Sequence, residues 1–84
     1  MKMHHKGVLA ESIRSYIQTA LLGGREVGYD ENLLLSGLLD SLAVASLVAE
    51  LERIAGLAIP PQDVTIQHFV SIDAMVAYVV GAQE

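Results

Sequence analysis

The chain has 84 residues and no cysteine, and its only aromatic residues are three tyrosines and one phenylalanine. Without cysteine, a disulfide framework, a cysteine-based zinc site and a protein thiol nucleophile are excluded. With so few aromatic side chains, the core must consist of Leu, Ile, Val and Ala, which is usual in helical bundles. The lack of cysteine also fits a reducing compartment.

Long hydrophobic runs are missing as well. The stretch 74–82 is the longest without a charged or polar side chain after the N-terminal region, and a membrane helix needs about 20 apolar residues. The apolar run after Lys6 is interrupted by Glu11, so no secretory signal is visible. We expect a cytoplasmic protein with one domain over residues 1–84, in which residues 1–6 form a disordered extension. A hydrophobic content of 52% argues against disorder of the rest.

Basic residues are scarce beyond the N-terminal part of the chain. Residues 1–25 carry a balance of +3, whereas residues 26–84 carry −8 with Arg53 as their single basic residue. Nucleic-acid binding needs clustered Lys and Arg, so it is excluded as a function. The acidic part suits partner proteins with basic docking surfaces.

Apolar spacings of three and four residues predict three main helices. The first covers 8–22 and ends at Gly23-Gly24; the second begins at Asp40-Ser41 and ends at Gly56. Ser71 is the expected N-cap of the last helix, which should end at Gly81. The predicted core stripes are Leu9, Ile13, Tyr16, Ile17, Ala20 and Leu21 in the first helix, Val44, Leu47, Val48, Leu51, Ile54 and Ala55 in the second, and Ile72, Met75, Val76 and Val79 in the last.

Two segments between these helices lack a sustained period. Residues 25–40 are expected to form an ordered loop with one helical turn, held on the bundle by its leucines. Pro60-Pro61 enforces an extended link, and residues 64–69 should form a single short helical turn. The fold class is therefore all-α: a small four-helix bundle with three main helices, one short helix and a long loop between the first two.

The most informative segment is Ser36-Gly37-Leu38-Leu39-Asp40-Ser41-Leu42. It places a hydroxyl at a helix start, directly after an acid and a leucine-flanked loop. Taken alone, Asp40-Ser41-Leu42 is explained by a capped helix. Leu42 shares a stripe with Ala45 and Ala49 that is turned from the core, so it is either an exposed docking contact or packed against the leucine-rich loop.

Together with its surroundings, this segment resembles the acyl carrier protein family, which includes peptidyl and aminoacyl carriers. The resemblance extends from the first helix to Tyr78. It is carried by the long loop, Gly-Leu-Leu-Asp-Ser-Leu at 37–42, Leu-Val-Ala-Glu-Leu-Glu at 47–52, Ile59-Pro60, and Ser-Ile-Asp-Ala at 71–74. It implies a stand-alone carrier rather than an enzyme, with an acyl-carrier-protein-like bundle.

The resemblance implies that Ser41 is the attachment site for 4′-phosphopantetheine, whose thiol would carry acyl or aminoacyl groups as thioesters. A phosphodiester at a helix start meets free amide groups and the positive end of the helix dipole. Asp40 would cap the helix and contribute to recognition by the magnesium-dependent transferase. Leu42 would contact partners, and Gly37 would let the loop turn close to Ser41.

The implied partners are a phosphopantetheinyl transferase, an acyl- or aminoacyl-loading ligase or transferase, and a downstream acceptor enzyme, with the carrier as a monomer. Fatty-acid carriers have a second helix rich in exposed carboxylates, whereas this one has only Glu50 and Glu52, opposed by Arg53. The segment 36–42 is closer to aminoacyl carriers, including D-alanyl ones. This difference predicts that the protein functions poorly with the enzymes of fatty-acid synthesis and that it belongs to a specialised pathway.

Other interpretations remain open at this point. The chain could be an unmodified helical adaptor that binds partners through the Leu42–Ala49 face, or a carrier-derived subunit that has lost modification. A hydrolase built from Ser41, His68 and Asp40 lacks a nucleophile elbow. His4 and His5 lack further metal ligands, His68 is expected to be a partly exposed packing residue, and Met75 belongs to the core. Whether cargo would enter the core is undecided.

Overall fold

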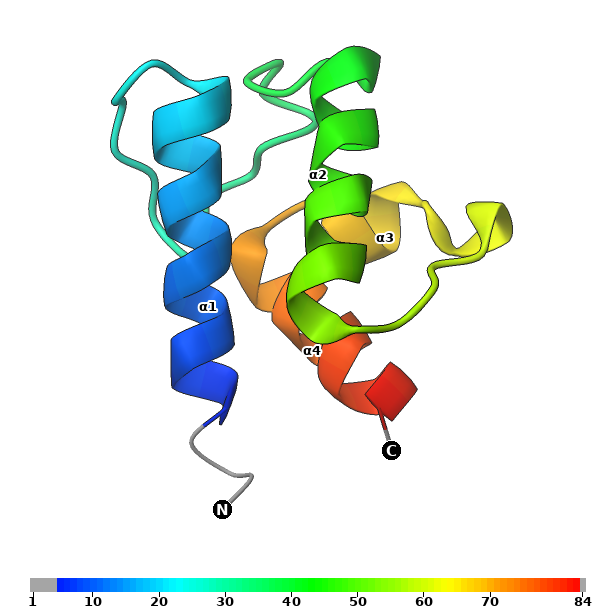
Figure 1. Cartoon of the computed structure of the whole chain (residues 1–84). Helices are drawn as coiled ribbons and strands as arrows, with labels where there is room; N and C mark the ends of the chain where they lie inside the picture. The colour runs from blue at the N-terminus through cyan, green and yellow to red at the C-terminus, as the bar shows by residue number, and fades with distance from the viewer. Residues whose placement is uncertain (1–4, 84) are drawn as a thin grey trace.

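A computed structural model describes residues 5–83 as four α-helices joined by short helical turns and one long loop (Figure 1). In chain order these are α1 (His5–Tyr16), the π-helical turn η1 (Ile17–Leu21), α2 (Ser41–Ala55), the 3₁₀ turn η2 (Pro61–Asp63), α3 (Ile66–Phe69) and α4 (Ile72–Gln83). The described residues contain no strand, and none of their helices is long and apolar enough to cross a membrane. The all-α architecture with three main helices and one short helix is confirmed.

Two predicted helix ends are wrong. The first helix begins at His5 rather than at residue 8, because the apolar stripe marks only the buried face and the helix continues beyond the last residue that packs. Residues 5 and 6, expected in a disordered extension, are therefore helical; residues 1–4 of that extension lie outside the described part. The last helix continues past Gly81 to Gln83, whose Nε2 donates to the Ala55 carbonyl oxygen at 3.2 Å.

The first helix widens before it ends. In η1 the N–H of Leu22 donates to the Ile17 carbonyl at 2.9 Å, a bond that spans five residues instead of four. The N–H of Gly24 then donates to the Gln18 carbonyl at 2.6 Å, and Gly23 and Gly24 both have positive φ. The predicted stop at these glycines is confirmed, while the π-helical turn before it was not predicted.

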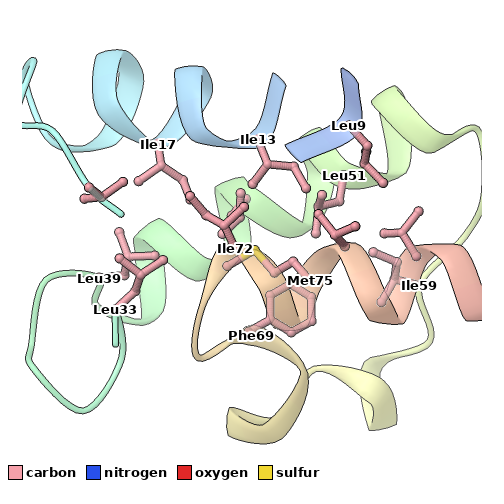
Figure 2. Close-up of a cluster of buried hydrophobic side chains, with 14 residues drawn as sticks. Leu9, Ile13, Ile17, Leu33, Leu39, Leu51, Ile59, Phe69, Ile72 and Met75 are labelled. Carbon is pink, nitrogen blue, oxygen red and sulfur yellow. The ribbon is translucent and has the colours of Figure 1, made fainter. Parts of the chain in front are cut away.

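A single apolar cluster holds the helices together, and no polar or charged residue of the described chain is buried. Side chains of α1 meet those of α2 and α4, and α3 adds Phe69 beneath them (Figure 2). The buried members of this core are Leu9, Ile13, Ile17, Val27, Leu33, Leu39, Leu47, Leu51, Ile59, Phe69, Ile72, Met75, Val76 and Val79. The predicted stripe of the last helix is confirmed in full, Met75 included.

The stripe predicted for the second helix is only partly correct. Leu47 and Leu51 are fully buried, whereas Val44, Val48, Ile54 and Ala55 are half-buried at the edge of the core. In the first helix, Tyr16 and Leu21 are also half-buried and Ala20 is exposed. A bundle this small surrounds each helix on one narrow face only, so the margins of a broad apolar stripe stay near solvent.

The long loop over residues 22–40 contains no helical residue, so the prediction of one helical turn in this loop is wrong. Leu33 and Leu39 enter the core beside Ile72, as Figure 2 shows, and the predicted anchoring by leucines is confirmed for them. Two backbone hydrogen bonds join the loop to the α3–α4 corner: Leu33 N–H to Val70 O at 2.7 Å, and Asp73 N–H to Tyr29 O at 2.9 Å. These bonds replace the helical bonds that the loop lacks.

Gly56 and Gly81 provide a matched pair for testing the helix ends. Gly56 has φ +67, whereas Gly81 lies inside α4, and a Cβ at either position would meet nothing within 4 Å. Gly56→Ala should lower the free energy of unfolding by about 1–2 kcal/mol, because it places an L-residue in the left-handed region. Gly81→Ala should raise it by about 0.5–1 kcal/mol, because alanine favours a helix interior. Urea unfolding followed by circular dichroism measures both, and equal signs would contradict the assigned ends.

Candidate functional site

The approach to α2 is built by a tight turn whose ends are anchored in the core. Gly37 has φ +84 and donates its N–H to the Leu34 carbonyl at 3.1 Å. The N–H of Leu39 donates to the Leu33 carbonyl at 3.0 Å, and both of these leucines are buried. The turn predicted at Gly37 thus needs glycine for its backbone conformation, and it delivers residue 40 from a fixed anchor.

Asp40 is the N-cap of α2, as predicted. Its backbone is extended, and its carboxylate Oδ1 accepts a hydrogen bond from the Ala43 N–H at 2.9 Å. Its carbonyl oxygen accepts the first helical bond, from Val44 N–H at 2.9 Å. The cap satisfies one of the free donors at the helix start and fixes where the helix begins.

Ser41 is the first residue of α2 and is exposed to solvent. Backbone N–H groups of a first helical turn point away from the helix body, and the aligned peptide dipoles make this end positive. A negatively charged group bonded to the Ser41 oxygen would be stabilised there by about 0.3–1 kcal/mol. The exposed position leaves the hydroxyl accessible to another protein.

An open apolar groove of about 500 Å³ begins at Ser41. One side is a face of α2, with residues spaced three, four and seven positions from the serine: Val44, Ala45 and Val48. The other side, which we call the outer wall, consists of Ile59, Pro61 and Val64. The hydroxyl of Ser41 is the only polar side-chain group that lines the groove.

The sequence did not predict this groove. The apolar spacing places Val44 and Val48 in the core, and no pattern relates the Pro60-Pro61 link to Ser41. The available signal was the width of the apolar stripe on the second helix, which exceeds what a small bundle can cover. The small side chain of Ala45, together with the extended backbone of Pro60, leaves the groove open. The extended link predicted for both prolines is correct for Pro60 only, because Pro61 already begins the η2 turn.

Three large apolar side chains are exposed in the first turn of α2, in the loop before it and at the start of α3. Leu42 is 77% exposed, Leu35 in the loop 70%, and Ile66 at the start of α3 56%. Ala45 and Ala49 are also exposed, on the stripe with Leu42 that is predicted to face away from the core. The alternative in which Leu42 packs against the leucine-rich loop is wrong, because the side chain points into solvent.

The carboxylates of α2 are engaged by neighbours. Glu50 forms an ion pair with Arg53, whose guanidinium holds the pKa of Glu50 below its ordinary value. Glu52 Oε2 accepts a hydrogen bond from the Ile59 N–H at 2.7 Å, which ties the segment after α2 to the helix. Since α2 has no other acidic residue, its surface offers no unpaired carboxylate.

The histidines do not form a catalytic or metal site with Ser41 in the described part of the chain. His68 is half-buried as predicted, with Nδ1 at 2.9 Å from the Asp63 carbonyl oxygen and its ring centroid 4.7 Å from that of Tyr78. The Asp40 carboxylate is engaged as the N-cap of α2, where it accepts the Ala43 N–H. Residues 5–83 contain no group of three or more metal-ligating side chains, and His4 lies outside the described residues.

Comparison with protein families assigns the chain to a family. A family model described as "phosphopantetheine attachment site" matches residues 11–79, which include α2, α3, the long loop, the second half of α1 and most of α4. The chain belongs to this family. Proteins with this domain carry 4′-phosphopantetheine covalently on a serine and act as carriers rather than catalysts. They interact with phosphopantetheinyl transferases and acyl-handling enzymes. A search of curated proteins finds no match to the sequence.

The residues present fit the phosphopantetheine arm of this family. An exposed serine hydroxyl stands at a helix N-terminus, where a phosphodiester is favoured, and an apolar groove opens beside it. The surroundings of Ser41 are therefore compatible with the group that this family carries.

The cap makes a separate, testable contribution to this site. Asp40→Ala should lower the free energy of unfolding by about 1 kcal/mol, because the Ala43 N–H loses its acceptor. Asp40→Ser, which supplies another good capping oxygen, should stay within a few tenths of wild type. Thermal and urea unfolding of both variants provides the measurement. Equal losses in the two variants would show that the carboxylate acts in some way other than capping.

Proposed function

We propose that Ser41 is the serine that carries the phosphopantetheine arm, and that the protein shuttles acyl groups between enzymes. The observation that carries this proposal is the exposed Ser41 hydroxyl at the capped start of α2, beside an apolar groove. When bound, the arm supplies the thiol for a thioester, which this cysteine-free chain cannot supply itself.

The other serines in the matched region have less suitable positions. The Ser36 hydroxyl donates to the Asn32 carbonyl at 2.6 Å, and Ser71 Oγ accepts from the Ala74 N–H at 3.1 Å as the cap of α4. Ser12, Ser15 and Ser46 lie within helices, away from a helix start. Ser41 alone combines exposure with the N-terminus of a main helix.

The neighbouring residues have roles that follow from their positions. Asp40 and Gly37 place Ser41 at the helix start, and the exposed Leu42 provides an apolar contact for the transferase and later partners. The arm and its cargo must leave and return repeatedly, which favours a monomer with an uncovered site. We expect a monomer for this reason.

The groove favours an apolar acyl group over an aminoacyl group as the cargo. No charged side chain lines it, so an ammonium group placed there would lose water without gaining a partner. An alkyl chain, by contrast, would replace water along Val44, Val48 and the outer wall.

An unmodified adaptor is the second candidate function. Leu42, Ala45 and Ala49 form an apolar face on α2 that could bind a partner without any arm. A carrier-derived subunit that has lost modification would use the same face. Both alternatives predict that Ser41 stays unmodified.

Incubation with coenzyme A, magnesium and a broad-specificity phosphopantetheinyl transferase distinguishes these functions. Intact mass should rise by one phosphopantetheinyl group in wild type and in Ser46→Ala, a control serine on the same helix. Ser41→Ala should gain nothing. If several transferases leave wild type unmodified, the adaptor is favoured.

The same assay tests the role of Leu42. Leu42→Asp should fold normally, because the side chain is 77% exposed, but its initial modification rate should fall about tenfold if it is a central contact. Ser46→Asp adds the same charge elsewhere on α2 and should change the rate much less. Normal modification of Leu42→Asp would remove the docking role.

The two carboxylates of α2 are both engaged by neighbouring groups, which supports a role for this protein in a specialised pathway. Enzymes of fatty-acid synthesis that dock through basic patches would find Glu50 and Glu52 already engaged. The transfer of malonyl groups by a fatty-acid synthesis transferase should therefore be markedly slower to this protein, in its phosphopantetheinylated form, than to a fatty-acid carrier. Equal initial rates in parallel assays would contradict the specialised role.

A further inference from the structure

Beyond the hydrogen bond from the Ile59 N–H to Glu52 Oε2 at its base, the outer wall of the groove has few bonds to other elements. The backbone hydrogen bonds of its η2 turn are all local: Asp63 N–H to Pro60 O at 2.9 Å, Val64 N–H to Pro61 O at 3.1 Å, and Thr65 N–H to Asp63 O at 3.0 Å. Only Ile59 at its base is buried, while Pro61 is exposed and Val64 half-buried. Local bonds shape this turn without holding it at a given distance from α2.

One residue of the turn, Asp63, joins it to the rest of the bundle. Asp63, which lies between the wall residues Pro61 and Val64, accepts a hydrogen bond at Oδ2 from the Tyr78 hydroxyl of α4 at 2.7 Å. The Asp63 carbonyl oxygen lies 2.9 Å from His68 Nδ1, and the His68 ring packs against that of Tyr78. The turn, α3 and α4 therefore meet at Asp63.

The partner on α4 is itself held in place. The ring of Tyr78 lies 6.4 Å from that of the buried Phe69, centroid to centroid, and its backbone sits between the buried Val76 and Val79. The bond to Asp63, with burial, raises the pKa of Tyr78 to about 12. At neutral pH the phenol therefore keeps its proton and remains the donor in this hydrogen bond.

We propose that the Asp63–Tyr78 hydrogen bond positions the outer wall against α2 and so controls how well the groove shields an apolar acyl chain. Asp63 and Tyr78 are positioning residues: neither lines the groove, yet the wall residues on both sides of Asp63 depend on them. This inference rests on the proposed function, because it takes the groove as the place where the cargo chain lies.

The proposal makes a prediction that depends on chain length. An octanoyl chain has a large apolar surface for the groove to cover, whereas an acetyl group has only one methyl group to bury. Opening the wall should therefore expose the octanoyl thioester to a soluble nucleophile and leave the acetyl thioester unaffected. A general loss of stability would not distinguish the two cargoes.

Thioester cleavage by hydroxylamine at neutral pH, followed by intact mass, provides the test. In the octanoyl-loaded protein, Tyr78→Phe, which removes only the hydroxyl, should speed cleavage by between about twofold and tenfold, the factor expected for one lost hydrogen bond. Asp63→Ala should behave alike. Asp63→Asn keeps an acceptor oxygen and should stay close to wild type. Acetyl-loaded forms of all four proteins should react at one rate.

Amide hydrogen exchange of the unmodified protein tests the wall separately. Tyr78→Phe should speed exchange of the Asp63, Val64 and Thr65 amides by a similar factor, while the Leu51 amide in α2 keeps its wild-type rate. This measurement needs no arm, so it reports on the hydrogen bond even if Ser41 is not modified.

The outcomes distinguish failure of the proposed function from failure of the wall's role. Failure of Ser41 to be modified overturns the proposed function and the role in cargo shielding, whatever the exchange rates show. With Ser41 modified, the inference is overturned if wild-type octanoyl and acetyl thioesters react at equal rates, or if Tyr78→Phe leaves octanoyl cleavage unchanged. Equal acceleration of both cargoes, or faster exchange without faster cleavage, overturns it as well.

Discussion

The burial of Leu33 and Leu39 determines where the functional end of this molecule lies. Both residues belong to a loop that has no helix, and their side chains are buried in the core. A hydrogen bond from the Leu39 N–H to the Leu33 carbonyl closes the turn around Gly37. Because Asp40 comes directly after Leu39, the start of α2 is placed by hydrophobic burial rather than by the loop's own hydrogen bonds. A small domain thereby presents an exposed serine on a rigid support.

Three faces of α2 serve different purposes. Leu47 and Leu51 hold the helix in the core, Val44 and Val48 border the groove, and Leu42 with two alanines faces away from the core. The apolar stripe of this helix is wider than its packing partners can cover. The uncovered margin is what makes a binding groove possible without a cavity inside the core, where the largest side chains are fully buried.

The local features of the fold were predictable from the sequence. Caps depend on residues a few positions apart, so Asp40, Gly56 and Ser71 could be assigned correctly. The end at Gly81 was wrong because a glycine inside a helix is tolerated when the chain beyond it finds a partner, here the carbonyl of Ala55. The residue proposed for attachment and its neighbours came from a motif of consecutive residues, which the fold keeps together.

The groove and its wall were not predictable in this way. Their residues come from segments on either side of Gly56, and their separation is decided by packing against α3 and α4. Asp63 and Tyr78 lie 15 positions apart on unrelated elements, with no periodicity to connect them. Such pairings arise from the assembled tertiary structure, which no local pattern encodes.

The π-helical turn η1 makes the length of α1 adjustable. A π turn accommodates one residue more than an α turn, so the chain could lose a single residue there and continue as an ordinary α-helix. A one-residue deletion absorbed in this way would leave Leu9 and Ile13 seated and keep the direction in which the long loop departs. The wide turn can therefore take up a change in helix length without moving the segment that leads to the serine.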